Sequence, residues 1–157
     1  MVKSSSQGSV TDLETNVLAA AKALPELAGK LTGNAIRVPT PNVSMAILNL
    51  NLEKAATREE MNEYLRYMAL HSDLHKQIDF VNSQEVVSTD FVGSRHAGVV
   101  DAEATITQDN RVVLYVWYDN EFGYSCQVVR VMEDMAGVNP PRSEERRVGK
   151  ECLRLCR

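Results

Sequence analysis

The sequence predicts an α+β fold, in which a largely antiparallel or mixed sheet is covered by helices on one face. Two observations predict the strands: short segments alternate apolar with polar side chains, and two of them are joined by a short polar turn. A third predicts the helices, because two segments repeat apolar residues at intervals of three and four without alternating regularly with the strands. At 157 residues, with 44% hydrophobic and 24% charged residues, the chain has the size and composition of one folded domain.

The first part of the chain predicts a leader followed by a short helix. Residues 1–18 are expected to form a divergent, disordered leader, since they open with a polar Ser-rich cluster and have no apolar run typical of a secretory signal. Ala19–Leu27 then contains good helix formers, and Gly29 is well placed to end the helix.

Ser44–Leu52 predicts a strand buried on one face. After Ile47 the residues alternate leucine with asparagine, which is the period of a strand. Pro39 and Pro41 lack the amide hydrogen that a sheet ladder needs, so we expect them at a turn or a strand edge.

A capping box predicts the start of the next helix. Thr57 is followed three residues later by Glu60, so that each side chain satisfies a backbone amide of the first turn. The apolar residues that follow at helical spacing are Met61, Tyr64, Leu65 and Met68. This stripe fits either core packing or a groove for a partner, and core packing is the commoner use.

A β-hairpin is predicted next. Val99–Thr107 alternates, the turn Gln108–Asn110 is polar, and Arg111–Tyr118 is rich in β-forming residues. The residues expected on one face of the first strand are Val100, Ala102, Ala104 and Ile106, and those opposed to them are Asp101, Glu103 and Thr105.

The last predicted element is an amphipathic helix that stops at Gly137. Its apolar stripe consists of Tyr124, Val128, Val131, Met132 and Met135. Asn139-Pro140-Pro141 cannot continue a helix, because proline has no amide hydrogen and clashes with the preceding turn.

The histidines give no clear metal site. His71 and His75 are spaced as two ligands on one helix face, but two ligands make a poor site, and exposed histidines at a helix end are far commoner. His96 lies in the loop GSRHAG, where a surface or hydrogen-bonded role is expected. We therefore assign no metal ligand.

Two other residues leave alternatives open. The junction Asp119-Asn120-Glu121, between a predicted strand and a predicted helix, either presents the Asn120 amide to a ligand or caps the helix, and spacing alone favours the cap. Arg37 either binds an anion or lies along the surface, as most arginines do.

Charge and cysteine content exclude several classes of protein. The formal net charge is −4, so no broad attraction to nucleic acid or to an anionic membrane is expected, and no apolar run is long enough to span a bilayer. The three cysteines are odd in number and do not form a CxxC pair, which favours a reducing, cytoplasmic location.

Three motifs, in this order, carry a resemblance to a known family. Leu24–Ser44 contains LTG followed by RVPTPNVS, Val86–Gly93 reads VVSTDFVG, and Trp117–Ser125 reads WYDNEFGYS. Together they resemble the catalytic domain of glyceraldehyde-3-phosphate dehydrogenases of the phosphorylating, bacterial type. The resemblance extends from about residue 19 to residue 137.

The resemblance implies a reaction and some residue roles. Members of this family oxidise and phosphorylate glyceraldehyde 3-phosphate with NAD and inorganic phosphate, and they form homotetramers. Arg37 matches the arginine that anchors the substrate phosphate, a role that suits a guanidinium group. Asn120 matches the asparagine that binds the nicotinamide carboxamide, and Tyr124 matches the aromatic residue packed near the nicotinamide.

The sequence also departs from the family. The motif SCTTN, with the catalytic cysteine, the histidine segment after it and the NAD-binding Rossmann domain are not in these 157 residues. Cys126 falls on the last helix, where it cannot be the nucleophile, so we assign no catalytic residue. We expect the chain alone to be inactive, either as part of such a dehydrogenase or as a non-catalytic module that associates with full-length subunits.

The resemblance also suggests domain limits. Residues 19–141 are expected to be a partial catalytic domain. Residues 142–157 are basic, which is typical of a nucleic-acid or membrane arm. We prefer a non-native tail, because RSEERRVGKEC resembles the translation of a sequencing-library adapter.

Overall fold

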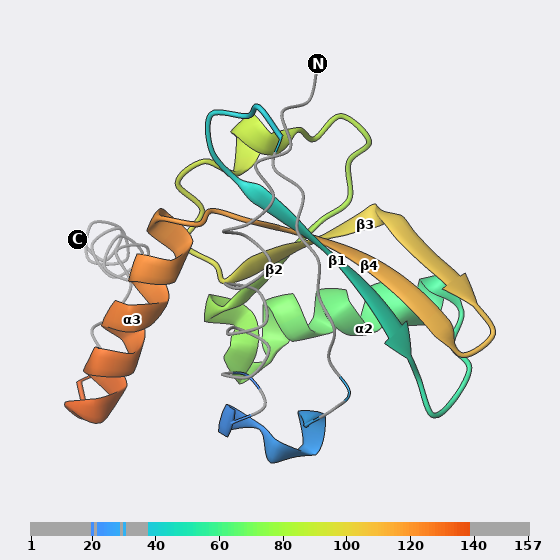
Figure 1. The fold of residues 1–157 in the computed structure, drawn as a ribbon, viewed down its shortest axis with the longest axis horizontal. Helices are drawn as coiled ribbons and strands as arrows, with labels where there is room; N and C mark the ends of the chain where they lie inside the picture. The colour runs from blue at the N-terminus through green and yellow to red at the C-terminus, as the bar shows by residue number, and fades with distance from the viewer. Residues whose placement is uncertain (1–19, 21, 29, 31–37, 139–157) are drawn as a thin grey trace, which may run out of the picture. The chain divides into compact units, whose positions relative to one another are not determined.

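A computed structural model describes residues 20, 22–28, 30 and 38–138 of the chain (Figure 1). The chain divides into two units, residues 1–39 and 40–157, and each is considered by itself. The described part of the first unit contains the 3-10 helix η1, Pro25–Leu27, and Leu24 N–H donates to the Ala20 carbonyl at 2.9 Å. The expected leader and tail lie outside the described residues, as does Gly29.

Four strands of the second unit form one mixed sheet in the order β1-β4-β3-β2 (Figure 1). They are β1, Ser44–Asn51; β2, Ile78–Val81; β3, Gly98–Gln108; and β4, Arg111–Tyr118. β4 pairs antiparallel with both β1 and β3, whereas β2 pairs parallel with β3. The α+β class, the mixed sheet and the predicted hairpin are thus confirmed, and the hairpin turn places Asp109 at a φ of 54°.

The predicted strand at Ser44–Leu52 is present as β1, but the prediction that it is buried on one face is wrong. β1 pairs with β4 along its whole length, from Ser44 opposite Tyr118 to Asn51 opposite Arg111. None of its residues is fully buried, and Ile47 is 55% exposed. The reason is that the helix α2 packs on β2 and β3, which lie toward the opposite edge of the sheet from β1.

Helix α2, Arg58–His71, lies across one face of the sheet (Figure 1). Its capping box is confirmed: Thr57 N–H donates to the Glu60 carboxylate at 2.9 Å, and Glu60 N–H donates to Thr57 Oγ1 at 3.2 Å. The predicted apolar stripe is wrong at Tyr64, which is 59% exposed, while Ala69 is buried. The buried face of α2 is therefore displaced toward Ala69.

A β-bulge interrupts the predicted alternation of β3. The pairing with β4 shifts between Asp101 and Ile106. Asp101 Oδ1 accepts the N–H groups of Glu103 and Ala104, at 3.1 and 3.2 Å, so the side chain replaces lost ladder partners. After the bulge Thr105 is 3% exposed and Ile106 is 54% exposed, which reverses the faces that strict alternation predicts.

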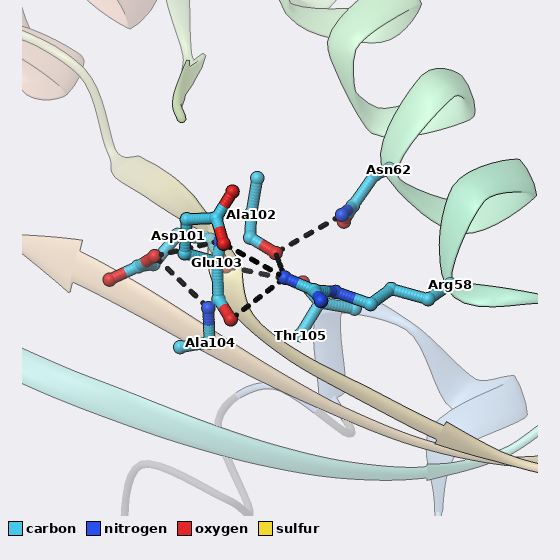
Figure 2. Close-up of polar contacts among 7 residues, drawn as sticks. All are labelled: Arg58, Asn62, Asp101, Ala102, Glu103, Ala104 and Thr105. Atoms are coloured by element: carbon cyan, nitrogen blue, oxygen red, sulfur yellow. Dashed lines mark hydrogen bonds and ion pairs between the residues drawn. The ribbon is translucent and has the colours of Figure 1, made fainter. Parts of the chain in front are cut away.

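Two side chains of α2 reach the same bulge from the helix side (Figure 2). Arg58 Nη2 donates to the carbonyl oxygens of Ala102 and Glu103 at 3.1 and 2.9 Å, and it lies 3.3 Å from the Glu103 carboxylate. Asn62 Nδ2 donates to the Ala102 carbonyl at 3.1 Å. We call Arg58, Asn62, Ala102 and Glu103 the α2–β3 clamp.

A small apolar cluster contains residues of all three sequence motifs. Its members are Val43, Phe91 and Val99, with the half-buried Val81, Val86 and Trp117 packed against them. Phe91 ends the 3-10 helix η3, Ser88–Phe91, in the VVSTDFVG motif, and its ring stacks on Trp117 of WYDNEFGYS with centroids 5.2 Å apart. The cluster therefore packs against the end of β4.

Helix α3, Phe122–Met135, follows β4 and extends away from the end of the sheet (Figure 1). The predicted helix and its end are confirmed, with Gly137 at a φ of +66°, a conformation that glycine adopts without strain. All five residues of the predicted apolar stripe are exposed here, including Met135 at 83%, so the expected burial of this face is wrong for the described residues. Within the described residues, no helix has the length and apolar character needed to cross a membrane.

Candidate functional site at the junction of β4 and α3

Two of the three predicted site residues lie at the junction between β4 and α3. Asn120 is the second residue after β4, and Tyr124 is in the first turn of α3. Asn120 is exposed, and its Nδ2 donates to Ser44 Oγ, at the start of β1, at 2.8 Å. Tyr124 is 71% exposed. The third predicted residue, Arg37, lies outside the described residues.

The junction Asp119-Asn120-Glu121 caps α3, as spacing alone favours, and the side chain that does so is Asp119. Asp119 is only 2% exposed. Its Oδ1 accepts the N–H groups of Glu121 and Phe122 at 3.0 and 2.9 Å, which are donors left unpaired at the helix start. Its Oδ2 accepts Gly93 N–H at 2.8 Å, from the loop after η3.

These hydrogen bonds keep Asp119 ionised. The N–H of Gly93 contributes most and that of Phe122 next to lowering the pKa of the Asp119 carboxyl below its ordinary value, with smaller contributions from Glu121 and the Asn42 side chain. Burial opposes the shift, since it disfavours a charge, but the donors outweigh it. The junction therefore contains a buried, fully bonded carboxylate next to an exposed carboxamide.

The loop after η3 packs closely against the start of α3. Gly93 has a φ of +82°, a left-handed conformation that other residues adopt at a cost. A Cβ on Gly123 would lie 2.7 Å from the His96 carbonyl oxygen, so only glycine fits there. Gln127 Nε2 of α3 also donates to the Arg95 carbonyl at 2.9 Å. Asp119, Gly123 and Gln127 together attach α3 to this loop.

The sequence places Asp119 in the junction before the last helix, but it does not show which residues Asp119 bonds to. A local signal was present, because an aspartate three residues before the first helical amide is a common cap. The bond to Gly93 has no such signal, since the two residues are 26 positions apart. The role of Ser44 is likewise visible only in the fold.

The histidines do not form a site in the described part of the chain. α2 ends at His71, and His75 belongs to the separate 3-10 helix η2, Asp73–Lys76, so the two are not successive ligands on one helix. His96 Nδ1 lies 3.5 Å from an Asp79 carboxylate oxygen. No group of three or more candidate ligands for a metal occurs among these residues. Cys126 is half-buried on α3.

A shallow cavity of about 360 Å³ lies beside the α2–β3 clamp, away from the junction. Its lining residues include Arg58, Asn62, Arg66 and three glutamates. The Arg58 guanidinium already bonds to β3 carbonyls, as Figure 2 shows, and the Arg66 guanidinium bonds to Glu63 at 2.8 Å. Because both guanidinium groups already bond to other residues of the chain, we assign no ligand to this cavity.

Comparisons with known proteins agree with the motifs. A family model described as "Glyceraldehyde 3-phosphate dehydrogenase, C-terminal domain" matches residues 9–120. The match begins within the expected leader, residues 1–18, and ends at Asn120.

Several curated proteins are similar to most of the chain. A glyceraldehyde-3-phosphate dehydrogenase-like protein of Pseudomonas aeruginosa is 92% identical over 123 residues, which are 78% of this chain and 27% of that protein. Glyceraldehyde-3-phosphate dehydrogenase 2 of Mucor circinelloides is 46% identical over 77% of this chain and 36% of its own length. The cytosolic enzyme of Pinus sylvestris is 46% identical over 75% of this chain and 34% of its own length. The chain thus spans about a third of the length of such relatives, or less.

Proposed function

Because the chain belongs to the glyceraldehyde-3-phosphate dehydrogenase family, we propose that it is part of the catalytic domain of an NAD-dependent enzyme that oxidises and phosphorylates glyceraldehyde 3-phosphate to 1,3-bisphosphoglycerate. Inorganic phosphate is the second substrate in this proposal. The whole protein would be a homotetramer located in the cytoplasm, in keeping with the relative named as cytosolic.

The observation that carries the proposal is the geometry of Asn120. A carboxamide both donates and accepts, so it pairs well with the carboxamide of nicotinamide. Asn120 is exposed for such a contact, yet its backbone is held between β4 and α3 and its side chain is held by Ser44. When bound, NAD supplies the hydride acceptor, and Asn120 orients the ring that receives it.

The other two roles rest on the motifs. Tyr124 is exposed beside Asn120 on the first turn of α3, where it would pack against the nicotinamide. Arg37, from RVPTPNVS, would bind the phosphate of the substrate, because its guanidinium group donates two parallel hydrogen bonds to an anion.

Crossed kinetic effects test these roles. In the full-length Pseudomonas aeruginosa relative with its matching 123 residues replaced by those of this chain, Arg37→Ala should raise KM for glyceraldehyde 3-phosphate roughly tenfold or more and leave KM for NAD unchanged. Asn120→Ala should show the opposite pattern. Arg111→Ala, at an exposed arginine of the hairpin, is the matched control. Equal effects of both variants on both substrates would refute the assignments.

The proposal also predicts that these 157 residues do not catalyse the reaction by themselves. The family nucleophile belongs to SCTTN, which the sequence does not contain, and Cys126 is half-buried on α3. NADH production by the purified chain, measured by absorbance with both substrates present, should equal the buffer rate. Any turnover above that rate overturns this part of the proposal.

A second candidate is a non-catalytic module that associates with full-length subunits. The exposed apolar side chains of the edge strand β1 favour it, since Ile47 is 55% and Leu48 42% exposed. Co-expression with a full-length relative separates the candidates. A module should co-purify in a fixed ratio, and Ile47→Lys should abolish the association, whereas Glu53→Lys, on exposed residue Glu53 just beyond β1, should not.

A further inference from the structure

A buried carboxylate stands directly next to the exposed carboxamide of Asn120. Both oxygens of Asp119 accept backbone N–H groups, from Gly93 on one side and from Glu121 and Phe122 on the other. A buried carboxylate needs such donors, because transfer from water without them is costly. The arrangement therefore fixes the position of Asp119 with respect to the loop after η3 and to the start of α3.

The backbone of Asn120 is fixed as a consequence. Asn120 lies between Asp119, which is held by Gly93, and Glu121, whose N–H is bonded to Asp119. The chain thus folds back around the carboxylate, and Asn120 is the exposed residue of that turn. A change in the bonds of Asp119 must move the Cα of Asn120.

The side chain of Asn120 has a second support. Its Nδ2 donates to Ser44 Oγ at 2.8 Å, and Ser44 pairs with Tyr118 across β1 and β4. One amide hydrogen is engaged, so the Oδ1 atom and the other amide hydrogen remain for a ligand. Two rigid strands and one buried carboxylate thus hold a carboxamide at the surface.

We propose that Asp119 is a positioning residue for Asn120, and that its hydrogen bonds to Gly93 and to the start of α3 set how the nicotinamide end of NAD is held. This inference rests on the role proposed for Asn120. Asp119 itself is buried and does not touch the cofactor. Its contribution passes through the backbone of the residue that follows it.

Binding measurements with two ligands test the proposal in the full-length chimaera of the Pseudomonas aeruginosa relative described above. NAD carries the nicotinamide, whereas ADP-ribose lacks it and reports on the rest of the cofactor site. Asp119→Asn replaces one acceptor oxygen by an amide that faces N–H donors. We expect this variant to lower the affinity for NAD roughly tenfold, measured by calorimetry, and to leave the affinity for ADP-ribose unchanged.

A double variant shows whether the effect passes through Asn120. Asn120→Ala should lower the affinity for NAD to a similar extent. The double variant, Asp119→Asn with Asn120→Ala, should bind NAD no more weakly than Asn120→Ala alone. Asp109→Asn, at an exposed aspartate of the β3–β4 turn, is the matched control and should change neither affinity. Asp119→Ser retains an acceptor for the start of α3 and supplies a second variant, with the same expected pattern, if Asp119→Asn fails to fold.

The outcomes separate this inference from the proposed function. An Asp119 variant that binds NAD as well as Asp109→Asn, an equal loss of ADP-ribose affinity, or additive losses in the double variant would each overturn the positioning role. An Asn120→Ala variant with unchanged NAD affinity would instead overturn the role of Asn120, and a chimaera that binds neither ligand would overturn the proposed function.

Discussion

In both the α2–β3 clamp and the β4–α3 junction a charged side chain bonds to backbone groups, and the two charges have opposite sign. In each, backbone groups lack a partner in the regular bonding of a sheet or a helix, and a charged side chain satisfies them. At the clamp the cation Arg58 donates to carbonyl oxygens of the bulge. At the junction the anion Asp119 accepts N–H groups from the loop and the helix. The cation is 40% exposed in its side chain, whereas Asp119 is 2% exposed.

The difference in burial predicts a difference in tolerance. Water can replace part of what Arg58 does, and the clamp already has two buried atoms without a partner, Arg58 Nε and Asn62 Oδ1. Asp119 is nearly inaccessible to water, so water replaces less of what its carboxylate does. We therefore expect the clamp to tolerate substitution and the junction to resist it, which suits a site that must hold Asn120 in one place.

Asp119→Ala should give the largest loss of stability. Three backbone N–H groups, those of Gly93, Glu121 and Phe122, lose an acceptor that is itself only 2% exposed. We expect a fall in Tm of roughly 10 °C, measured by circular dichroism at pH 7. A fall no greater than that of Arg58→Ala would show that burial does not distinguish the two regions.

The pH dependence of Asp119 gives an independent check. Its pKa is lower in the folded chain than in the unfolded one, so its contribution is present above pH about 4 and is lost as pH falls through the folded value. The difference in Tm between the wild type and Asp119→Asn should therefore be constant near neutral pH and shrink in acid. A difference that grew in acid would contradict the sign of the shift.

Gly123→Ala should give the next largest effect. In an open helix this change is favourable, but the new Cβ would lie 2.7 Å from the His96 carbonyl oxygen, a backbone atom of the packed loop. We expect a loss of about 1–3 kcal/mol in the free energy of unfolding, from urea titration. Gly98→Ala is the comparison, because its Cβ would meet a Val116 methyl at 2.6 Å, which can move, so its loss should be smaller.

Arg58→Lys should have a smaller effect than either change at the junction. Lysine keeps the charge but cannot present one guanidinium to two carbonyls and a carboxylate. We expect a loss of about 1 kcal/mol, discounted for the exposure of the side chain. Arg66→Lys is the matched control, since its ion pair with Glu63 is on the surface of the same helix. An unchanged stability in Arg58→Lys would mean that the bulge holds itself together through Asp101.

What the sequence predicts correctly here depends on residues close together in the chain. The strand that begins at Ser44, the capping box of Thr57 and the stop at Gly137 each involve only a few neighbouring positions. The bulge in β3 is different, because Arg58 bonds to Ala102 across 44 positions of the sequence. The alternation of apolar and polar residues cannot show such a contact. The exposure of β1 also depends on where α2 packs.

The candidate site follows the same rule. Asn120 is identified through the motif WYDNEFGYS, and spacing alone favours a cap in its place. The actual cap, Asp119, is locally recognisable, but its bond to Gly93 depends on the fold. The non-local bonds are therefore what the sequence could not predict, and they are the bonds on which the position of Asn120 rests.

Asn62→Ala should have the smallest effect, and its combination with Arg58→Lys sharpens the comparison most. Both side chains donate to the Ala102 carbonyl oxygen, so the loss of one leaves that acceptor bonded by the other (Figure 2). Asn62→Ala alone should cost less than about 1 kcal/mol, also because it removes the unpartnered Oδ1. With Arg58→Lys the Ala102 carbonyl loses both the Asn62 donor and the guanidinium donor, and an ammonium group replaces them incompletely, so the double loss should exceed the sum of the single losses. Additive losses, measured in the same urea titrations, would mean that the two donors do not share an acceptor in solution. A double loss above the sum would show that the clamp tolerates single substitutions because its two donors are redundant, whereas at the junction one carboxylate has no substitute.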